Sequence, residues 1–255
     1  MTYMQEKKSG RLIFAGGTHR GLCREVNEDN FCYIDSPDES NQFAVVADGI
    51  GGHRDGQYAS MFCCSYMIQA WRKNNIGDET DLEAVKEFLY HTVEACNQEL
   101  YRQNQLKPPG KPMGSTIVAA VFMPTQVVVI HAGDSRIYMW HNNVMERWSN
   151  DHSLVMELVK KNIITQEEMG SHPYSHVILS SIGPALKLKL DVNCFERHRG
   201  QRFLLCSDGL IRNLSDAQLG DILKSSNSPK AALDQMIRDT LRAGAEDNIA
   251  IVCAF

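Results

Sequence analysis

Three runs of β-branched and apolar residues lie close together in the middle of the chain, at residues 115–122, 127–130 and 136–140. Only a few residues separate each run from the next, whereas a crossover between parallel strands needs about a dozen residues or more. Neighbouring strands in this part of the chain must therefore be joined by hairpins. This spacing predicts a sheet that is largely antiparallel.

The other predicted elements flank these hairpins. Further strands are predicted at residues 43–47, 202–206 and 249–255. Helices are predicted at residues 57–73, 81–105, 215–223 and 229–242. Ser215, with Gln218 three residues later, has the pattern of a capping box, which marks the start of the third helix. Strands and helices that cluster in separate stretches favour a layered α+β domain.

Length and charge limit the classes of protein to consider. The chain has 255 residues and a formal net charge of −5, and we expect residues 13–255 to form one domain behind an N-terminal extension of residues 1–12. No long basic run is present, which argues against nucleic acid as a partner. The longest apolar run, residues 117–123, is far shorter than the ~20 residues that span a bilayer. We therefore expect no membrane partner.

The cysteines indicate the compartment. Five of the eight lie inside apolar stretches, and no Cys-x-x-Cys pair is present. This pattern is typical of buried free thiols rather than of disulfides or a zinc site. The N-terminus also lacks the pattern of a secretion signal, so we expect a cytoplasmic protein.

Acidic residues stand at the ends of apolar strands throughout the sequence. Three of them directly follow a predicted strand: Asp48, Asp134 and Asp208. Asp247 stands just before the last strand, and the pair Glu28 and Asp29 precedes a strand-like stretch. Any one of them alone is better explained as a turn residue. Carboxylates gathered at one end of packed sheets, however, repel unless cations neutralise them. Oxygen ligands without a Cys/His set select Mg²⁺ or Mn²⁺, which leads to the hypothesis of a two-metal hydrolase site.

Short motifs surround these acids in a fixed order along the chain. They are Arg24-x-x-x-Glu28-Asp29, the glycine-rich segment that begins at Asp48, Gly114-Ser115-Thr116, HAGDSRIYMW, NDHSLV, LLCSDGL and EDNIAIV. The set resembles the metal-dependent protein phosphatases of the 2C class, the PPM family, over about residues 17–255. The resemblance implies a four-layer α-β-β-α sandwich, in which two stacked, mainly antiparallel sheets are flanked by helices and the metals lie at one end.

The resemblance also implies a ligand set for two Mn²⁺ or Mg²⁺ ions. Asp48 resembles the carboxylate that bridges both ions, with the Gly49 carbonyl as an additional ligand. Asp208 and Asp247 resemble ligands of the first ion, and Glu28 resembles a ligand of the second. The implied reaction is hydrolysis of phosphoserine and phosphothreonine in proteins by direct attack of a metal-bridging water or hydroxide.

Three further residues receive roles from the same resemblance. Arg24 resembles the phosphate-binding arginine of the family, whose planar guanidinium suits a phosphoryl group. Asp29 resembles a residue that supports the metal ligands. Asp134 is similar to the ligand of a third, weaker ion in many bacterial members. The implied partners are phosphorylated proteins, the substrates of a cognate Ser/Thr kinase.

The sequence departs from the family pattern at three places. Ile50 stands where many members have a histidine that is proposed as general acid. Arg212 replaces a second carboxylate after Asp208, which argues against a third ion. The expected flap, about residues 150–185, carries Ser175 and Ser181 where relatives often have arginines. We expect this flap to attract phosphopeptides differently.

Other functions stay open as alternatives. A non-catalytic phosphoprotein-binding pseudophosphatase would have the same fold, although all of its predicted carboxylate ligands are present. A metal-dependent phosphodiesterase would need a similar metal site. Nucleotide binding is disfavoured because Arg54 stands where a dinucleotide fingerprint needs glycine. A thiol phosphatase is disfavoured because no phosphate loop lies between Cys23 and Arg24.

Overall fold

Two antiparallel sheets lie face to face in the computed structural model of the chain, which describes residues 10–35, 41–52, 54–74, 76, 80–108 and 110–255. The first sheet has the order β1 (Phe14–His19), β11 (Ile249–Ala254), β10 (Arg202–Cys206), β7 (Arg136–His141) and β8 (Val144–Arg147). The second has the order β2 (Asp29–Ile34), β3 (Gln42–Ile50), β5 (Ile117–Phe122), β6 (Gln126–Ala132) and β9 (Asp191–Glu196), and β4 (Gly114–Ser115) pairs with the end of β3. All of these pairs are antiparallel, as predicted.

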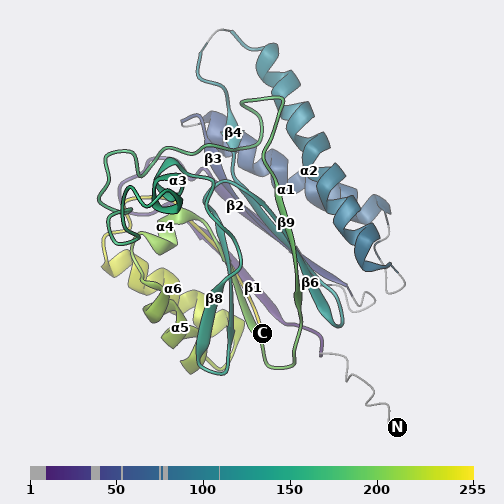
Figure 1. Cartoon of the computed structure of the whole chain (residues 1–255), viewed down its shortest axis with the longest axis vertical. Helices are drawn as coiled ribbons and strands as arrows, with labels where there is room; N and C mark the ends of the chain where they lie inside the picture. Colours follow the sequence, from purple (N-terminus) through teal and green to yellow (C-terminus); the bar gives the residue numbers. More distant parts are fainter. Residues whose placement is uncertain (1–9, 36–40, 53, 75, 77–79, 109) are drawn as a thin grey trace.

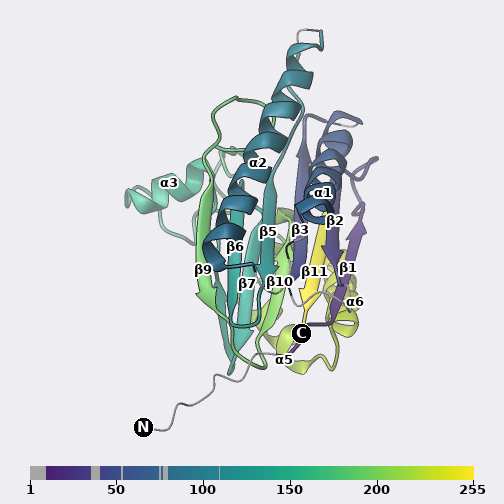
Figure 2. The same ribbon diagram turned by 90° about the vertical axis from the view of Figure 1, so that its right-hand side faces the viewer.

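Helices cover the outer faces of both sheets (Figures 1 and 2). The second sheet is covered by α1 (Arg54–Asn74) and α2 (Leu82–Gln105). The first is covered by α4 (Asp208–Ile211), α5 (Asp216–Ser225) and α6 (Pro229–Arg242). One short helix, α3 (Leu154–Lys160), projects away from the layers (Figure 2). The four-layer α-β-β-α sandwich implied by the sequence motifs is therefore confirmed.

Strand β3 shows how the layers form the core. Its alternate side chains Phe43 and Val45 pack beneath α1 and α2, while Ala44 and Val46 pack between the two sheets. On the helix side, the Phe43 ring stacks on Trp71 of α1 with the centroids 4.9 Å apart. Because both faces of the strand are buried, its sequence reads as a continuous apolar run rather than an alternating one.

The predicted helices agree with the structure at their capped ends. Ser215 and Gln218 form the predicted capping box at the start of α5, and α6 has the predicted bounds. The predicted strand at residues 115–122, in contrast, divides into β4 and β5 at Thr116. Sequence patterns did not identify β1, β8, β9, α3 or α4, which are short, half-exposed or lie within the flap. None of the helices in the described ranges combines the length and the apolar composition that a membrane-spanning segment needs.

Candidate metal centre

Strand pairing brings two of the predicted acids face to face. Asp29 begins β2, Asp48 lies near the end of β3, and the antiparallel register places them directly opposite each other. Thr116, between β4 and β5, fixes the backbone of Asp48: the Asp48 N–H donates to Thr116 Oγ1 at 3.0 Å, and the Thr116 N–H donates to the Asp48 carbonyl at 2.8 Å. The break between β4 and β5 thus serves to hold Asp48 in place.

Asp208 and Asp247 meet at the same end of the sandwich from the other sheet. Asp208 follows β10, Asp247 precedes β11, and these two strands are antiparallel neighbours. Gly209 allows the close approach, because a Cβ atom at this position would lie only 1.9 Å from the Asn248 carbonyl oxygen. Any side chain at residue 209 would therefore push the turn that carries Asp208 away from Asp247.

Two glycines make room for Glu28 in the same way. A Cβ atom at Gly56, in the first turn of α1, would lie 2.4 Å from Glu28 Oε1, and one at Gly49 would lie 2.1 Å from the Gly56 carbonyl oxygen. The Gly49 N–H donates to the Glu28 carbonyl at 3.1 Å. The predicted ligands Glu28 and Gly49 are therefore in direct contact at the start of α1.

Asn248 organises the loop that leads to Glu28, a role that no sequence pattern predicted. Its Oδ1 accepts from the Glu28 N–H at 2.8 Å, while its Nδ2 donates to the carbonyls of Arg20 at 2.8 Å and Val26 at 3.0 Å. Asn248 is 3% exposed. The only sequence signal for this role is its position directly after Asp247. Its hydrogen-bond partners lie near the N-terminus, so no local pattern connects them to Asn248.

Asp29 is a buried carboxyl group with an unusual pKa. Ser207 Oγ donates to Asp29 Oδ2 at 2.5 Å and accepts from the Ala250 N–H at 2.8 Å. Burial raises the pKa of Asp29 to about 8, and the charges of Asp208 and Asp247 act in the same direction. The Ser207 bond opposes this effect without cancelling it.

The acids of this centre form one interacting group. Burial raises the pKa of Asp48 well above its ordinary value, and the charges of the neighbouring carboxylates act in the same direction. Carboxylates gathered in a buried place repel one another. These oxygens are the hard ligands that Mn²⁺ and Mg²⁺ prefer, and divalent cations would relieve the repulsion. The residues present therefore fit a divalent metal centre.

Two arginines lie at the rim of the centre, each against one of the acids. Arg24 Nη2 lies 2.9 Å from Asp247 Oδ2. Arg212 contacts Asp208 Oδ2 through Nε at 2.8 Å and through Nη2 at 2.6 Å. Both guanidinium groups are exposed on their outer side. Positive charge is thus available to a ligand that approaches the acids from solvent.

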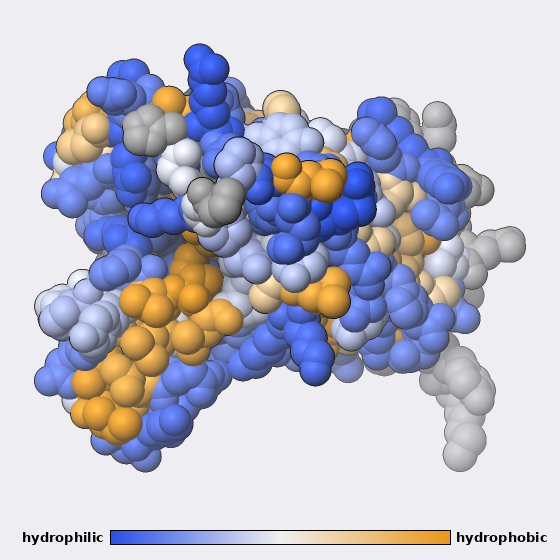
Figure 3. Space-filling view, turned by 90° about the horizontal axis from the view of Figure 1, so that it is seen from above, coloured by the Kyte–Doolittle hydropathy of each residue, from blue (hydrophilic) through white to orange (hydrophobic). Residues whose placement is uncertain are grey.

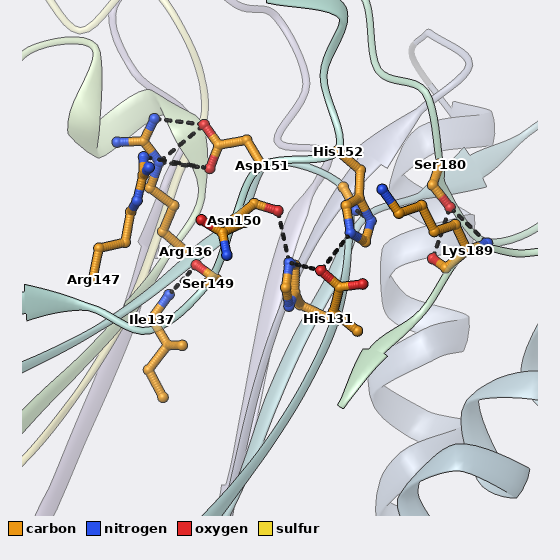
Figure 4. A network of polar contacts seen from close by, with 12 residues as sticks. His131, Arg136, Ile137, Arg147, Ser149, Asn150, Asp151, His152, Ser180 and Lys189 are labelled. Atoms are coloured by element: carbon orange, nitrogen blue, oxygen red, sulfur yellow. Dashed lines mark hydrogen bonds and ion pairs between the residues drawn. The ribbon is translucent and has the colours of Figure 1, made fainter. Parts of the chain in front are cut away.

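Asp134 lies at the edge of this group, in the turn after β6. The segment that follows β8 holds this turn (Figure 4): Asp151 accepts from Arg136 Nε at 2.9 Å and from Nη2 at 2.6 Å, and the His152 N–H donates to the Gly133 carbonyl at 2.8 Å. Ser153, the next residue, is the N-cap of α3. The base of the flap and the turn that carries Asp134 are therefore joined.

Two stacked histidines lie behind this junction (Figure 4). The rings of His131 and His152 are 4.7 Å apart, and their ring nitrogens lie within 4.8 Å of a carboxylate oxygen of Asp191. His131 Nε2 lies 2.9 Å from the Asn150 carbonyl oxygen. Burial lowers the pKa of both histidines, so they are neutral at physiological pH. Their contacts hold residues 150–152 against β6 and β9.

The flap carries an apolar surface beside the centre. Figure 3 shows apolar side chains gathered on the arm that contains α3. The large apolar residues of the flap that are more than half exposed are Ile163, Tyr174 and Leu179. A cavity of about 400 Å³ lies between the flap and α4, with Asp134, Asp208 and Arg212 in its wall. Asp134 and Asp208 therefore border a cleft with charged walls, and the flap forms one side of it.

Comparison with known protein families identifies the family of this chain. The family model of protein phosphatase 2C matches residues 17–250. The chain belongs to the protein phosphatase 2C family. It is 34% identical over 237 residues to the serine/threonine phosphatase stp of Listeria innocua. The aligned region covers 92% of each protein. The family named from the sequence motifs is thus confirmed.

Solved structures of related phosphatases have the same fold. Stp1 from Staphylococcus aureus superposes with a TM-score of 0.88 at 26% identity, covering 100% of this chain and 98% of that one. The catalytic domain of the serine/threonine protein phosphatase PstP, in complex with 2 manganese ions, gives a TM-score of 0.82 at 28% identity, covering 95% and 97%. A relative of this chain therefore binds two manganese ions on this fold.

Proposed function

We propose that this protein phosphatase 2C family member hydrolyses phosphoserine and phosphothreonine in proteins, with two Mn²⁺ or Mg²⁺ ions bound at the acidic centre. Asp48 would contact both ions, assisted by the Gly49 carbonyl. Asp208 and Asp247 would bind one ion and Glu28 the other. When bound, such ions lower the pKa of a water molecule and stabilise charge on the phosphoryl group.

One observation carries this proposal. Carboxyl groups from β2, β3, α4 and the start of β11 gather at one end of the sandwich, where those of Asp29, Asp48 and Asp208 have raised pKa values. Burying several carboxyl groups together costs stability, and a fold tolerates this cost where the groups serve a function. Carboxyl groups with perturbed pKa values beside an open cavity are typical of active sites. The family membership identifies the function as phosphatase activity.

The residues of the chain have separate tasks in this reaction. Arg24, at the exposed rim beside Asp247, would bind the oxygens of the phosphoryl group that do not react. Asp29 would keep Asp48 in position from the opposite strand, itself held by Ser207. No side chain needs to form a covalent intermediate, because water is the nucleophile.

The partners follow from the reaction. Phosphorylated proteins are the substrates, and we infer that a Ser/Thr kinase with overlapping targets supplies them. We also infer a cytoplasmic location, which is supported by eight cysteines that are all free thiols in the described part of the chain.

A comparison of substrates tests the proposal. The full chain is assayed with added Mn²⁺ on a phosphothreonine peptide, an aryl phosphate monoester and an aryl phosphate diester, each with a parallel sample in excess chelator. We expect hydrolysis of both monoesters, no hydrolysis of the diester, and none of any substrate in chelator. Preferred cleavage of the diester would identify a phosphodiesterase instead. Binding of the phosphopeptide without phosphate release would identify a pseudophosphatase.

A further inference from the structure

The cavity beside the acidic centre contains its own positive charges. Its wall includes the carboxylates of Asp134, Asp151, Asp208 and Glu246 and the guanidinium groups of Arg136 and Arg212. Arg136 pairs with Asp151, and Arg212 pairs with Asp208. Two of the four carboxylates therefore already have an arginine partner.

Asp134 is the buried acid of this cavity that lacks such a pairing. It is 7% exposed, and its Oδ1 atom has no hydrogen-bond partner among the described residues. Burial and the Asp208 charge raise the pKa of Asp134 to about 8, while the charge of Arg212 acts to lower it. The electrostatic influence of Arg212 therefore extends from Asp208 to Asp134.

The position of Arg212 is set by α4, the shortest helix in the described part of the chain. Asp208 is the first residue of α4 and Arg212 is its C-cap, so the two lie one turn apart on one face. Both Nε and Nη2 of Arg212 contact the same oxygen, Asp208 Oδ2. A divalent cation that bound between Asp208 and Asp134 would lie against this guanidinium and be repelled by it.

We propose that the guanidinium of Arg212, through its ion pair with Asp208, takes the place beside Asp134 that a third divalent ion would need. The inference rests on the proposed function, because it assumes that Asp208 also contributes to a two-ion centre. It makes Arg212 a positioning residue that acts through Asp208. The protein should then bind two ions and no more, even at millimolar metal.

Counting bound ions tests this inference without reference to activity. The full chain is dialysed against Mn²⁺ from micromolar to 10 millimolar, and bound metal per chain is measured by mass spectrometry. The samples are wild type, Arg212→Asp, Arg212→Lys and Arg238→Asp. The last variant makes the same charge change at an exposed position of α6 that is not in the wall of the cavity. Circular dichroism verifies that each variant is folded.

We expect two ions per chain in wild type, Arg212→Lys and Arg238→Asp, and three in Arg212→Asp. Three ions in wild type would overturn the inference, and so would two ions in folded Arg212→Asp. If Arg212→Asp fails to fold, the wild-type count still decides, because a third ion beside Arg212 is what the inference denies. Fewer than two ions in wild type, together with no hydrolysis, would instead overturn the proposed function itself.

Discussion

Asp29 and Asp48 lie directly opposite each other across the β2–β3 pair, and both carboxyl groups hold protons more tightly than ordinary aspartates. A register that pairs two acids is destabilising by itself, because like charges directly opposite on a sheet repel. The sandwich positions two further acids, Asp208 and Asp247, at the same end. The fold therefore places at this end a charge that divalent cations would balance.

Replacing Asp48 by Asn separates activity from stability. The amide keeps the shape of the side chain but removes the charge, so we expect turnover at saturating Mn²⁺ to fall at least ~100-fold. The melting temperature without metal should rise, because repulsion with Asp29 and Asp208 is relieved. Asp234→Asn, which changes the same residue type on the surface of α6, is the matched control and should leave both quantities unchanged. Unaltered turnover in Asp48→Asn would remove Asp48 from the metal centre.

The stability of the metal-free protein should depend on pH in a defined direction. Asp29 and Asp134 have pKa values near 8 when folded, compared with an ordinary value of 3.8. Their protons stabilise the fold at low pH, and this contribution is lost as the pH rises through about 8. Between pH 6.5 and 8, we expect the melting temperature in chelator to fall by at least ~5 °C. The same scan with saturating Mn²⁺ should be flat; equal slopes would contradict this account.

Arg24 should affect substrate binding more than chemistry. If it contacts phosphoryl oxygens in the ground state and the transition state alike, its loss appears mainly in KM. We expect Arg24→Ala to raise KM for a phosphothreonine peptide about tenfold or more, the cost of a charge-assisted hydrogen bond, with a smaller change in kcat. Steady-state kinetics measure the two constants, with Arg238→Ala as control. A fall in kcat at constant KM would show that Arg24 acts on the reacting atoms instead.

Asn248 should be important for stability although it binds no metal in this account. Asn248→Ala removes hydrogen bonds to Glu28, Arg20 and Val26, so we expect a loss of about 2–3 kcal/mol in the free energy of unfolding. Denaturant unfolding of the metal-free protein measures this loss. Because the loop carries Glu28, the affinity for Mn²⁺ should fall as well. A variant of full stability would mean that these bonds are replaced by water.

The parts of the fold that sequence patterns predicted are those with local signals. Helix α6 has Ser228 as its N-cap and Pro229 in its first turn, and β5 and β6 are joined by a short hairpin. Strand β9 could not be predicted because its residues are half-exposed and do not alternate clearly. The division at Thr116 depends on a contact with Asp48, which lies far away in the sequence.

The same distinction holds for the candidate site. Asp48, Asp208 and Asp247 were found because each stands at the end of an apolar strand, and the structure brings them to one end of the sandwich. Asn248 and Ser207 were missed, since each acts through residues of the N-terminal loop or of β2 that no local pattern connects to them. The substitution at Arg212 was visible in the sequence, but its ion pair with Asp208 required the structure.

Phosphate release from a phosphothreonine peptide, measured against free Mn²⁺ for wild type and Asp208→Asn, tests the central claim most directly. The account predicts no activity of the wild type in chelator, a saturable increase with Mn²⁺, and turnover in Asp208→Asn that is at least ~100-fold lower at saturating metal. Asp234→Asn should follow the wild-type curve, and circular dichroism should show that all three proteins are folded. Full wild-type activity in chelator, or near-normal turnover in Asp208→Asn, would contradict a metal-dependent phosphatase centred on these acids.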